Sequence, residues 1–314
     1  MNKQEQFDYI NEHFPYECGR LSNRRVRQTF FSKIDTELQA YLLGFHAADG
    51  CVDDSRNTFR VQLQESDSEL IYLFKDNIAP DARVFTIQPR ELICNRTGKK
   101  YISEAMFGVN IYCAHITDDL TKLGFGSNKT FLELHLPKID DSLIRHFIRG
   151  YFDGDGSVIG TAIEPDPKHR KINWTFRTKA VFTSKTKSLL EEIQIWLKNN
   201  NITKSSICLT GRDCYVLSIP TSQMQKLFKL FYEDSNFYLK RKYEKFNHFV
   251  NTEVTQLIAE YRNAQKVSVS DSNNPSTSAE HPIGVKMCAE LTGNCENSEI
   301  KNSEDNIIEV SLRS

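Results

Sequence analysis

The sequence lacks any long hydrophobic run, and no apolar stretch approaches the roughly 20 residues that a membrane-spanning helix requires. Its first residues, MNKQEQFDYINEHF, are polar and acidic, which is typical of neither a secretory signal peptide nor an arginine-rich transit peptide. We therefore expect no membrane partner. The expected location is intracellular, in phage or bacterial cytoplasm or in an organelle matrix.

The eight cysteines lack the spacing of a metal site. None forms a Cys-x-x-Cys pair, and Cys208 and Cys214 have no histidine partners at zinc-finger spacing. Reduced and mostly buried thiols are expected of an intracellular protein. A metal site built from sulfur is not expected.

A strong net charge is absent as well, because 40 basic residues nearly balance 41 acidic ones. The distribution is uneven, however. Residues 141–265 contain 19 basic and 13 acidic residues, a net charge of +6, whereas residues 1–140 and 266–314 have net charges of −3 and −4. This asymmetry permits binding to nucleic acid but does not identify it.

The last part of the chain has little to bury. VSVSDSNNPSTSAEHP is dense in Ser, Asn, Asp and Pro and cannot offset its own ordering entropy. We expect a disordered acidic tail from about residue 266, within a C-terminal extension over 251–314. Residues 1–34 are expected to form a short basic arm with Arg20, Arg24, Arg25 and Arg27.

An internal repeat of about 106 residues organises the remainder, and its copies are expected over 35–135 and 136–250. Each copy opens with an apolar stretch that ends in Asp-Gly, AYLLGFHAADG and HFIRGYFDGDG. Strand-like segments, an amphipathic helix, further strands (106–112 and 214–219) and a closing helix follow in the same order. The prediction is an α+β fold of two αββαββα repeats, with a last basic helix over 237–249.

The two opening helices are expected to pack against each other. Gly44 and Ala48 are four residues apart, as are Gly150 and Gly154, so each pair lies on one helical face where backbones can approach. Gly50 and Gly156 then terminate the helices, because glycine readily takes the left-handed conformation.

This packing would bring Asp49 and Asp155 to the same end of the helix pair. A carboxylate at a helix C-terminus is electrostatically disfavoured, and two close together are worse. A divalent cation resolves the conflict, and Mg²⁺ prefers oxygen ligands, retained waters and phosphates. We expect a Mg²⁺ site, with Mn²⁺ able to substitute. Its expected residues are Asp49, Asp155, Ala48 and Gly154.

LLGFHAADG (42–50) and IRGYFDGDG (148–156) resemble the two motifs of LAGLIDADG homing endonucleases. The resemblance implies a monomer with pseudo-twofold symmetry, the two motif helices at the interface and antiparallel sheets forming a DNA-binding saddle. It also implies Mg²⁺-dependent cutting of long double-stranded DNA sites across the minor groove, with short 3′ overhangs. Asp49 and Asp155 would be the catalytic acids. Ala47 departs from the pattern, because its counterpart Asp153 is acidic.

Polar faces of the predicted strands are the candidate DNA contacts. In FRVQLQ at 59–64, apolar residues alternate with Arg and Gln, which suit guanine and adenine edges in the major groove. The candidate reading residues are Arg60, Gln62, Gln64, Arg177 and Lys179, followed by a weaker set of Ser206, Thr210 and Arg212. The candidate phosphate contacts are Arg24, Arg25, Arg27, Lys240, Arg241, Lys242 and Lys245.

One feature of active family members is hard to find in this sequence. They carry a basic residue near the metals, late in the strands of each half, and none is evident at the end of 106–112 or 214–219. Lys179 is a candidate from another strand. Glu65 and Ser184 fall near the positions that order active-site water in the family.

Three alternatives stay open from the sequence alone. An intron maturase, or another DNA- or RNA-binding relative without cleavage, would retain the two aspartates as relics, with intron RNA as a possible partner. An intein-embedded domain is disfavoured by the start at Met1 and the absence of flanking splicing blocks. A duplicated scaffold that binds a protein would require both Asp-Gly helix ends to be coincidental turns.

Overall fold

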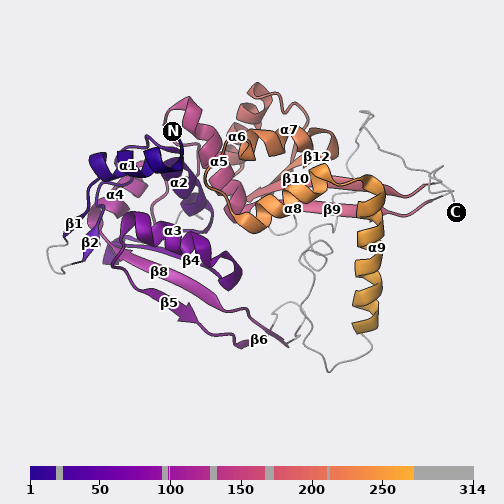
Figure 1. Cartoon of the computed structure of the whole chain (residues 1–314), viewed down its shortest axis with the longest axis horizontal. Helices are drawn as coiled ribbons and strands as arrows, with labels where there is room; N and C mark the ends of the chain where they lie inside the picture. The colour runs from indigo at the N-terminus through magenta and orange to yellow at the C-terminus, as the bar shows by residue number, and fades with distance from the viewer. Residues whose placement is uncertain are drawn as a thin grey trace. The chain divides into compact units, whose positions relative to one another are not determined.

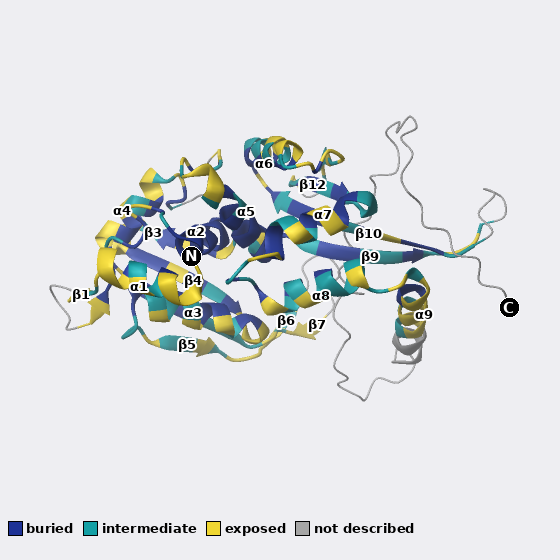
Figure 2. Ribbon diagram, turned by 45° about the horizontal axis from the view of Figure 1, so that its top comes forward, coloured by how far each residue is buried: buried dark blue, intermediate teal, exposed yellow. Residues whose placement is uncertain are grey.

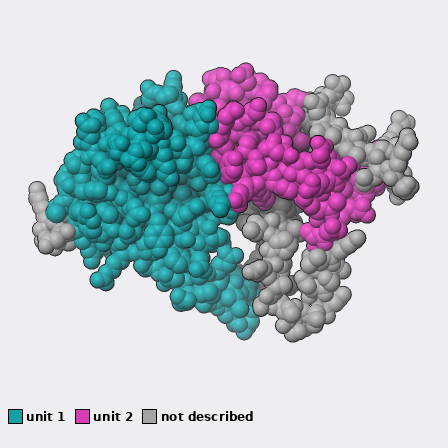
Figure 3. All heavy atoms as spheres, viewed as in Figure 1, with its two compact units in different colours: residues 1–155, 234–241 teal, residues 156–233, 242–314 magenta. Residues whose placement is uncertain are grey.

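The computed structural model describes residues 1–18, 24–93, 98, 100–127, 133–166, 173–210 and 213–271, with side chains described up to 265. The chain forms two compact units (Figures 1 and 3). Unit 1 comprises residues 1–155 and 234–241. Unit 2 comprises residues 156–233 and the chain from 242 onward.

Unit 1 contains a four-stranded antiparallel sheet with the strand order β3-β4-β8-β5. Its main elements are α1 (Lys3–His13), α2 (Glu37–Asp49), β3 (Cys51–Asp53), β4 (Thr58–Gln64), α3 (Ser68–Ile78), β5 (Val84–Ile87), β8 (Met106–Tyr112), α4 (Ala114–Lys122) and α5 (Asp141–Asp155). Two short ribbons accompany the sheet: β1 (Glu17–Cys18) with β2 (Arg25–Val26), and β6 (Glu91–Ile93) with β7 (Lys100–Ile102).

Unit 2 contains a second four-stranded antiparallel sheet, with the order β9-β10-β12-β11. Its elements are β9 (Ser157–Ile163), β10 (Thr175–Ser184), α6 (Lys187–Asn199), β11 (Ser206–Leu209), β12 (Tyr215–Pro220), α7 (Thr221–Tyr232) and α9 (Val254–Asp271). Helices α6 and α7 lie against β10 and β12 (Figure 1). Helix α8 (Lys240–Asn251) begins at the end of the segment that belongs to unit 1.

The two sheets confirm the predicted α+β repeat. In each copy a helix is followed by two strands, a second helix, two more sheet strands and a third helix. The spatial order is also the same, because β3-β4-β8-β5 and β9-β10-β12-β11 place the four sheet strands of each copy in equivalent positions. The ribbon β6–β7 is an addition that the second copy lacks in its described part.

Helix α2 is buried along nearly its whole length (Figure 2). All residues from Glu37 to Ala47 are buried, as expected of a helix that is apolar on every side. Helix α3 instead buries only one stripe, with Leu70, Ile71, Phe74 and Ile78 at helical spacing. Such a stripe is typical of a helix that covers a sheet and faces water on its other side.

The N-terminal residues do not form the expected arm. Residues 3–13 form helix α1, which starts with a capping box between Asn2 and Glu5. The buried Gln6 side chain accepts a hydrogen bond from the backbone N–H of Leu38 at 3.0 Å and donates to Glu37 at 3.2 Å. Helix α1 therefore stabilises the first turn of α2.

The C-terminal extension is also more ordered than expected. Helix α9 continues to Asp271, beyond residue 266. Val254, Leu257, Ile258 and Tyr261 follow an apolar i, i+3, i+4, i+7 pattern, and this stripe packs against Phe176 of β10. Residues 272–314, and with them most of the predicted tail, lie outside the described residues. Within the described part, no helix is both long and apolar enough for a bilayer.

Candidate active site at the ends of two paired helices

Helices α2 and α5 pack backbone to backbone within unit 1. A Cβ atom added at Gly44 would fall well under 3.0 Å from the carbonyl oxygen of Phe147, and one at Gly150 equally close to that of Tyr41. Real Cβ atoms essentially never come so close. The two glycines thus lie in the helix seam, where the sequence predicts them.

Gly50 and Gly156 end these helices for a different reason from the one expected. Gly50 has φ −73° and ψ 160°, which is an extended conformation open to any residue. Gly156 has no positive φ either. A Cβ atom at Gly50 would instead collide with the His46 ring, which contacts the carbonyl oxygen of Phe125 at 2.8 Å through Nε2. Glycine is therefore required at position 50 because a side chain there would collide with the His46 ring, and not because the backbone is left-handed.

Asp49 and Asp155 are the last residues of their helices, and both are exposed. Each follows a half-buried small residue, Ala48 or Gly154. The two ends also meet, since a Cβ atom at Gly154 would lie 3.0 Å from Oδ2 of Asp49. The seam therefore brings the Asp49 carboxylate next to the residue that precedes Asp155.

Asp153 has a structural position in spite of its place in the motif. It is 1% exposed, and its Oδ2 accepts hydrogen bonds from the Tyr41 hydroxyl at 2.9 Å and the backbone N–H of Leu239 at 2.7 Å. Its counterpart Ala47 is buried in α2. Asp153 is thus directed into the protein, away from the exposed carboxylates.

Basic residues reach this end of the seam from the first turn of α8. Arg241 binds Asp67 with two hydrogen bonds, at 2.6 and 2.7 Å. These bonds raise the pKa of Arg241, and the charges of Asp67, Asp153 and Asp49 add to the shift. Lys242 is 6% exposed, and its Nζ donates at 2.6 Å to the carbonyl oxygen of Gly156, the residue after Asp155.

From the sequence, these two residues are predicted only as phosphate contacts, and the basic group near the metals is expected on strands. A usable signal was present. Cations are disfavoured in the first turn of a helix, where the dipole is positive, and α8 begins Lys240-Arg241-Lys242. A cluster that opposes its own helix is more often functional than accidental.

The outer face of β4 carries the predicted polar residues. Arg60 and Gln64 are exposed and Gln62 is half-buried, while the alternating Phe59, Val61 and Leu63 are buried. Arg60 is held across the ladder, because its Nε donates to Oδ1 of Asn110 at 2.7 Å. A guanidinium fixed in this way retains further donors that can contact a base edge.

The matching face of unit 2 differs in chemistry. Arg177 is exposed and Lys179 half-buried on β10, but Lys179 is directly opposite Ile159 in the ladder. Ile159 belongs to a buried apolar cluster with Val181 and Val216. Ser206 is exposed on β11, and the Thr210 hydroxyl donates to the carbonyl oxygen of Cys214 at 3.0 Å. Arg212 lies outside the described residues.

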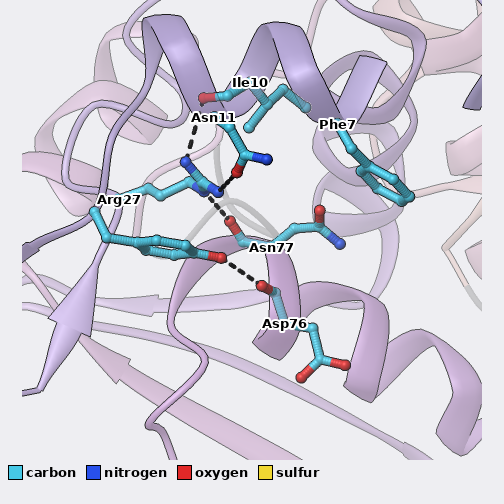
Figure 4. Close-up of a pocket in the computed structure, with 7 residues that line it drawn as sticks. Phe7, Ile10, Asn11, Arg27, Asp76 and Asn77 are labelled. Atoms are coloured by element: carbon cyan, nitrogen blue, oxygen red, sulfur yellow. Dashed lines mark hydrogen bonds between the residues drawn. The ribbon is translucent and has the colours of Figure 1, made fainter. Parts of the chain in front are cut away.

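Arg27 is not a phosphate contact. It is 3% exposed and lines a cavity of about 220 Å³ together with residues of α1 and α3 (Figure 4). Its guanidinium donates to the carbonyl oxygens of Ile10, Phe14 and Asn77 and lies 3.7 Å from the ring centroid of Tyr16. These contacts join the two helices and engage the guanidinium on several sides.

The other predicted basic contacts are placed more openly. Arg24 and Lys240 are exposed, and Lys245 is half-buried with its Nζ 5.9 Å from the Phe249 ring centroid. Arg25 is exposed but forms a two-point ion pair with Asp81. Arg20 lies outside the described residues.

The two proposed water-ordering residues differ. Glu65 is exposed at the start of the turn between β4 and α3. Ser184 is 6% exposed, and its hydroxyl oxygen accepts a hydrogen bond from the backbone N–H of Thr186 at 3.0 Å. Ser184 therefore closes the turn before α6, and this position does not suit an exposed water-binding residue.

The carboxylates fit a metal that takes few protein ligands. Within the described ranges, no three His, Cys, Asp or Glu side chains are grouped as a metal cage would need. Mg²⁺ does not require one, because it is commonly held by one or two carboxylates with waters and phosphates. Sulfur is not part of the site. Of the described cysteines, Cys18 and Cys51 are exposed, against the expectation of mostly buried thiols.

Comparison with known proteins identifies the domain. The family model of the LAGLIDADG-like domain matches residues 142–230, from α5 to α7. Residues 142–230 thus resemble a LAGLIDADG-like domain, in agreement with the resemblance seen in the sequence.

Individual proteins show a more distant similarity. The DNA-directed RNA polymerase subunit Rpo1C of Methanocaldococcus jannaschii is 28% identical over 144 residues, which are 46% of this chain but only 14% of that subunit. The LAGLIDADG meganuclease I-AabMI, bound to uncleaved DNA, is 13% identical with a TM-score of 0.46 over 74% of this chain and 97% of its own. I-SmaMI, bound to uncleaved target DNA in the presence of calcium ions, is 12% identical with a TM-score of 0.43 over 74% and 99%.

Proposed function

We propose that the protein is a site-specific endonuclease that hydrolyses phosphodiester bonds of double-stranded DNA, with a divalent metal ion bound by Asp49 and Asp155. The observation that carries this proposal is the close approach of the exposed Asp49 carboxylate to Gly154, the residue before the exposed Asp155. An exposed acid at a helix C-terminus opposes the helix dipole. Two of them close together are accounted for by a ligand of positive charge.

The charges around the seam support the same conclusion. Hydrogen bonds to Asp67 raise the pKa of Arg241, and the charge of Asp49 adds to this shift. The site thus combines acidic groups for a metal with a basic group suited to a phosphate. Mg²⁺, or Mn²⁺ in its place, would polarise a phosphoryl oxygen and make bound water a better nucleophile.

The residues of the chain supply position and charge. Asp49 and Asp155 would hold the ion, with the backbone of Ala48 and Gly154 beside it. Arg241 would neutralise the phosphate. Arg60, Gln62 and Gln64 would read base edges in the major groove, because a polar face of an antiparallel sheet can enter that groove.

The first prediction tests this assignment. Purified protein is incubated with a randomised library of long DNA duplexes and Mg²⁺ or Mn²⁺, and the cut ends are sequenced. We expect one family of related sites. Asp49→Asn and Asp155→Asn should each lower the cutting rate by about 1,000-fold or more, because removal of one metal-binding charge leaves a few kcal/mol of transition-state stabilisation missing. Binding to the selected site should change little.

Asp118→Asn is the matched control, because Asp118 is an exposed helical aspartate of α4 remote from the seam in the sequence. It should cut at the wild-type rate. Full double-strand cutting by either seam variant would refute the assignment. A wild-type protein that cuts no duplex but binds intron RNA tightly would favour the maturase alternative instead.

A further inference from the structure

Residues 235–241, here called the strap, belong to unit 1 and include the first two residues of α8. Carboxylates hold the backbone of the strap. The N–H groups of Asn236 and Phe237 donate to Oε1 of Glu37, at 2.8 and 3.2 Å. Those of Leu239 and Lys240 donate to Asp153 at 2.7 Å and to Glu69 at 3.1 Å. Four backbone amides are thus fixed by three acidic side chains.

Two of the three anchoring carboxylates, those of Asp153 and Glu37, are buried. Asp153 is 1% and Glu37 7% exposed, and Arg149, which is fully buried, pairs with Glu37 at 2.7 Å. Arg149 also donates to the carbonyl oxygen of Phe237 at 2.9 Å and to the Ser235 hydroxyl at 2.7 Å. Buried charges are costly unless their partners are well placed. The strap completes this network, so its position is strongly specified.

The strap ends in the first turn of α8, whose basic residues lie at the positive end of the helix dipole. Lys240, Arg241 and Lys242 occupy the start of α8, where the helix dipole disfavours cations. Acidic groups from α3, α5 and the turn before α3 compensate: Glu69 and Asp153 accept the N–H groups at the helix start, and Asp67 binds the Arg241 side chain. These contacts hold Arg241 close to the end of α5, because Leu239, two residues before Arg241, is bonded to Asp153, two residues before Asp155.

We infer that Asp153 and Glu37 are positioning residues, which dock the strap and thereby hold Arg241 at the aspartate-bearing end of the helix seam. The inference rests on the proposed function. Asp153, the earlier acidic residue of the second motif, would then position the strap and would not bind the metal. The first motif lacks this acid, because Ala47 stands there.

The test compares two changes at one hydrogen-bonded group. Asp153→Ala gives α5 the residue that α2 has at the matching position, and it removes the acceptor of the Leu239 N–H. Tyr41→Phe is the matched control, since it removes the other hydrogen bond to Asp153 and leaves the strap contact in place. Both variants are studied as full-length protein, by native-state hydrogen exchange and by single-turnover cutting of the selected duplex.

We expect faster exchange of the amides of residues 236–240 in Asp153→Ala but not in Tyr41→Phe. Cutting should slow by about 10- to 100-fold in Asp153→Ala alone, because displacement of a catalytic group by about 1 Å costs up to that much. The DNA dissociation constant should stay within about threefold, because the substitution leaves the exposed basic residues that would contact phosphates unchanged. Should Asp153→Ala be poorly folded, Asp153→Asn is used in the same two measurements.

Arg241→Ala provides a readout that a purely structural role would not change. If Arg241 supplies a cation to the site, millimolar guanidinium should restore much of its lost cutting without changing its melting temperature. Unchanged exchange in Asp153→Ala would overturn the docking of the strap. Wild-type cutting by Asp153→Ala, or no rescue of Arg241→Ala, would overturn the positioning role alone. An inactive wild-type protein would overturn the proposed function as well.

Discussion

At the residue scale, the buried cluster at the start of α2 has a defined response to pH. His146 is 5% exposed, and burial together with the nearby Arg149 guanidinium lowers its pKa to about 3. Arg149 Nη1 donates to His146 Nδ1 at 2.9 Å, which requires that nitrogen to be unprotonated. Burial opposes ionisation of Glu37, but Arg149 and Asn236 outweigh it and lower the pKa of Glu37.

The sign of the pH effect follows from these shifts. Below pH 6.5 the unfolded chain protonates His146, whereas the folded protein does so only near pH 3. Stability is therefore fully present above pH 6.5 and falls as the pH drops toward 3. When the pH is lowered from 7 to 5.5, the free energy of unfolding should decrease in both proteins. We expect this decrease to be about 1 kcal/mol smaller in His146→Gln than in the wild type.

Urea denaturation at the two pH values measures this difference. His115→Gln is the control, because His115 is exposed on α4 and should leave the pH dependence unchanged. The pKa of Glu37 is lowered, so its contribution to the free energy of unfolding is lost only below the pH at which a glutamate ordinarily titrates. Glu37 therefore does not affect the comparison between pH 7 and 5.5. Equal pH dependence in His146→Gln and the wild type would contradict a neutral, buried imidazole.

At the element scale, the close contact of α2 and α5 depends on two glycines. A methyl group at Gly150 would press on backbone atoms of Tyr41 and Phe45, which cannot move without displacing α2. We expect Gly150→Ala to lower the free energy of unfolding by about 3 kcal/mol or more, at the upper end of overpacking effects. Chemical denaturation provides the measurement.

Gly124→Ala separates steric from conformational effects. Gly124 has φ +90° and nothing within 4 Å of an added Cβ atom, so its substitution should cost only about 1–2 kcal/mol of backbone strain. A Gly150→Ala variant that loses no more stability than Gly124→Ala would show that the helices can separate slightly at no cost. The shared position of Asp49 and Asp155 would then be less strictly fixed.

The same scale shows what local sequence could predict. Strand β8 has the predicted bounds, and α7 closes the second repeat as predicted, because apolar periodicity and turn residues act over short distances. Helix α1 was missed because its apolar stripe is short and only Gln6 and Ile10 are buried. The end of α9 was not predicted, because the helix continues past its apolar stripe into KVSVSD, whose Ser and Asp residues disfavour a helix interior.

At the scale of the whole molecule, the two aspartates and the cations differ in how far they could be predicted. Each aspartate belongs to a short motif that contains its own packing glycine. Arg241 instead meets Asp67 across 174 residues of sequence, and the strap that carries it is fixed by Glu37 and Asp153 from two other helices. Contacts between residues so far apart in the sequence leave no periodic pattern from which they could be predicted.

The two sheets also present different chemistry to a partner, which leads to the last prediction. The outer face of β4 offers Arg60, held by Asn110, whereas the corresponding face of unit 2 places Lys179 beside a buried apolar cluster. Half of the target should therefore depend more on polar base contacts than the other half. Phosphate contacts, in contrast, should come from basic residues such as Lys245.

Substitution should separate these two kinds of contact. Lys245→Gln should weaken binding to all duplexes alike and reduce the slope of log K against log salt concentration by about 0.9, the value for one lost phosphate contact. Arg60→Gln should instead relax preference at one base pair by about 1–3 kcal/mol, because only a base-edge contact distinguishes sequences. Binding to a library of single-base variants at several salt concentrations measures both quantities. If Arg60→Gln weakened every sequence equally, its guanidinium would be binding a phosphate, and the outer face of β4 would position the protein on DNA without reading it.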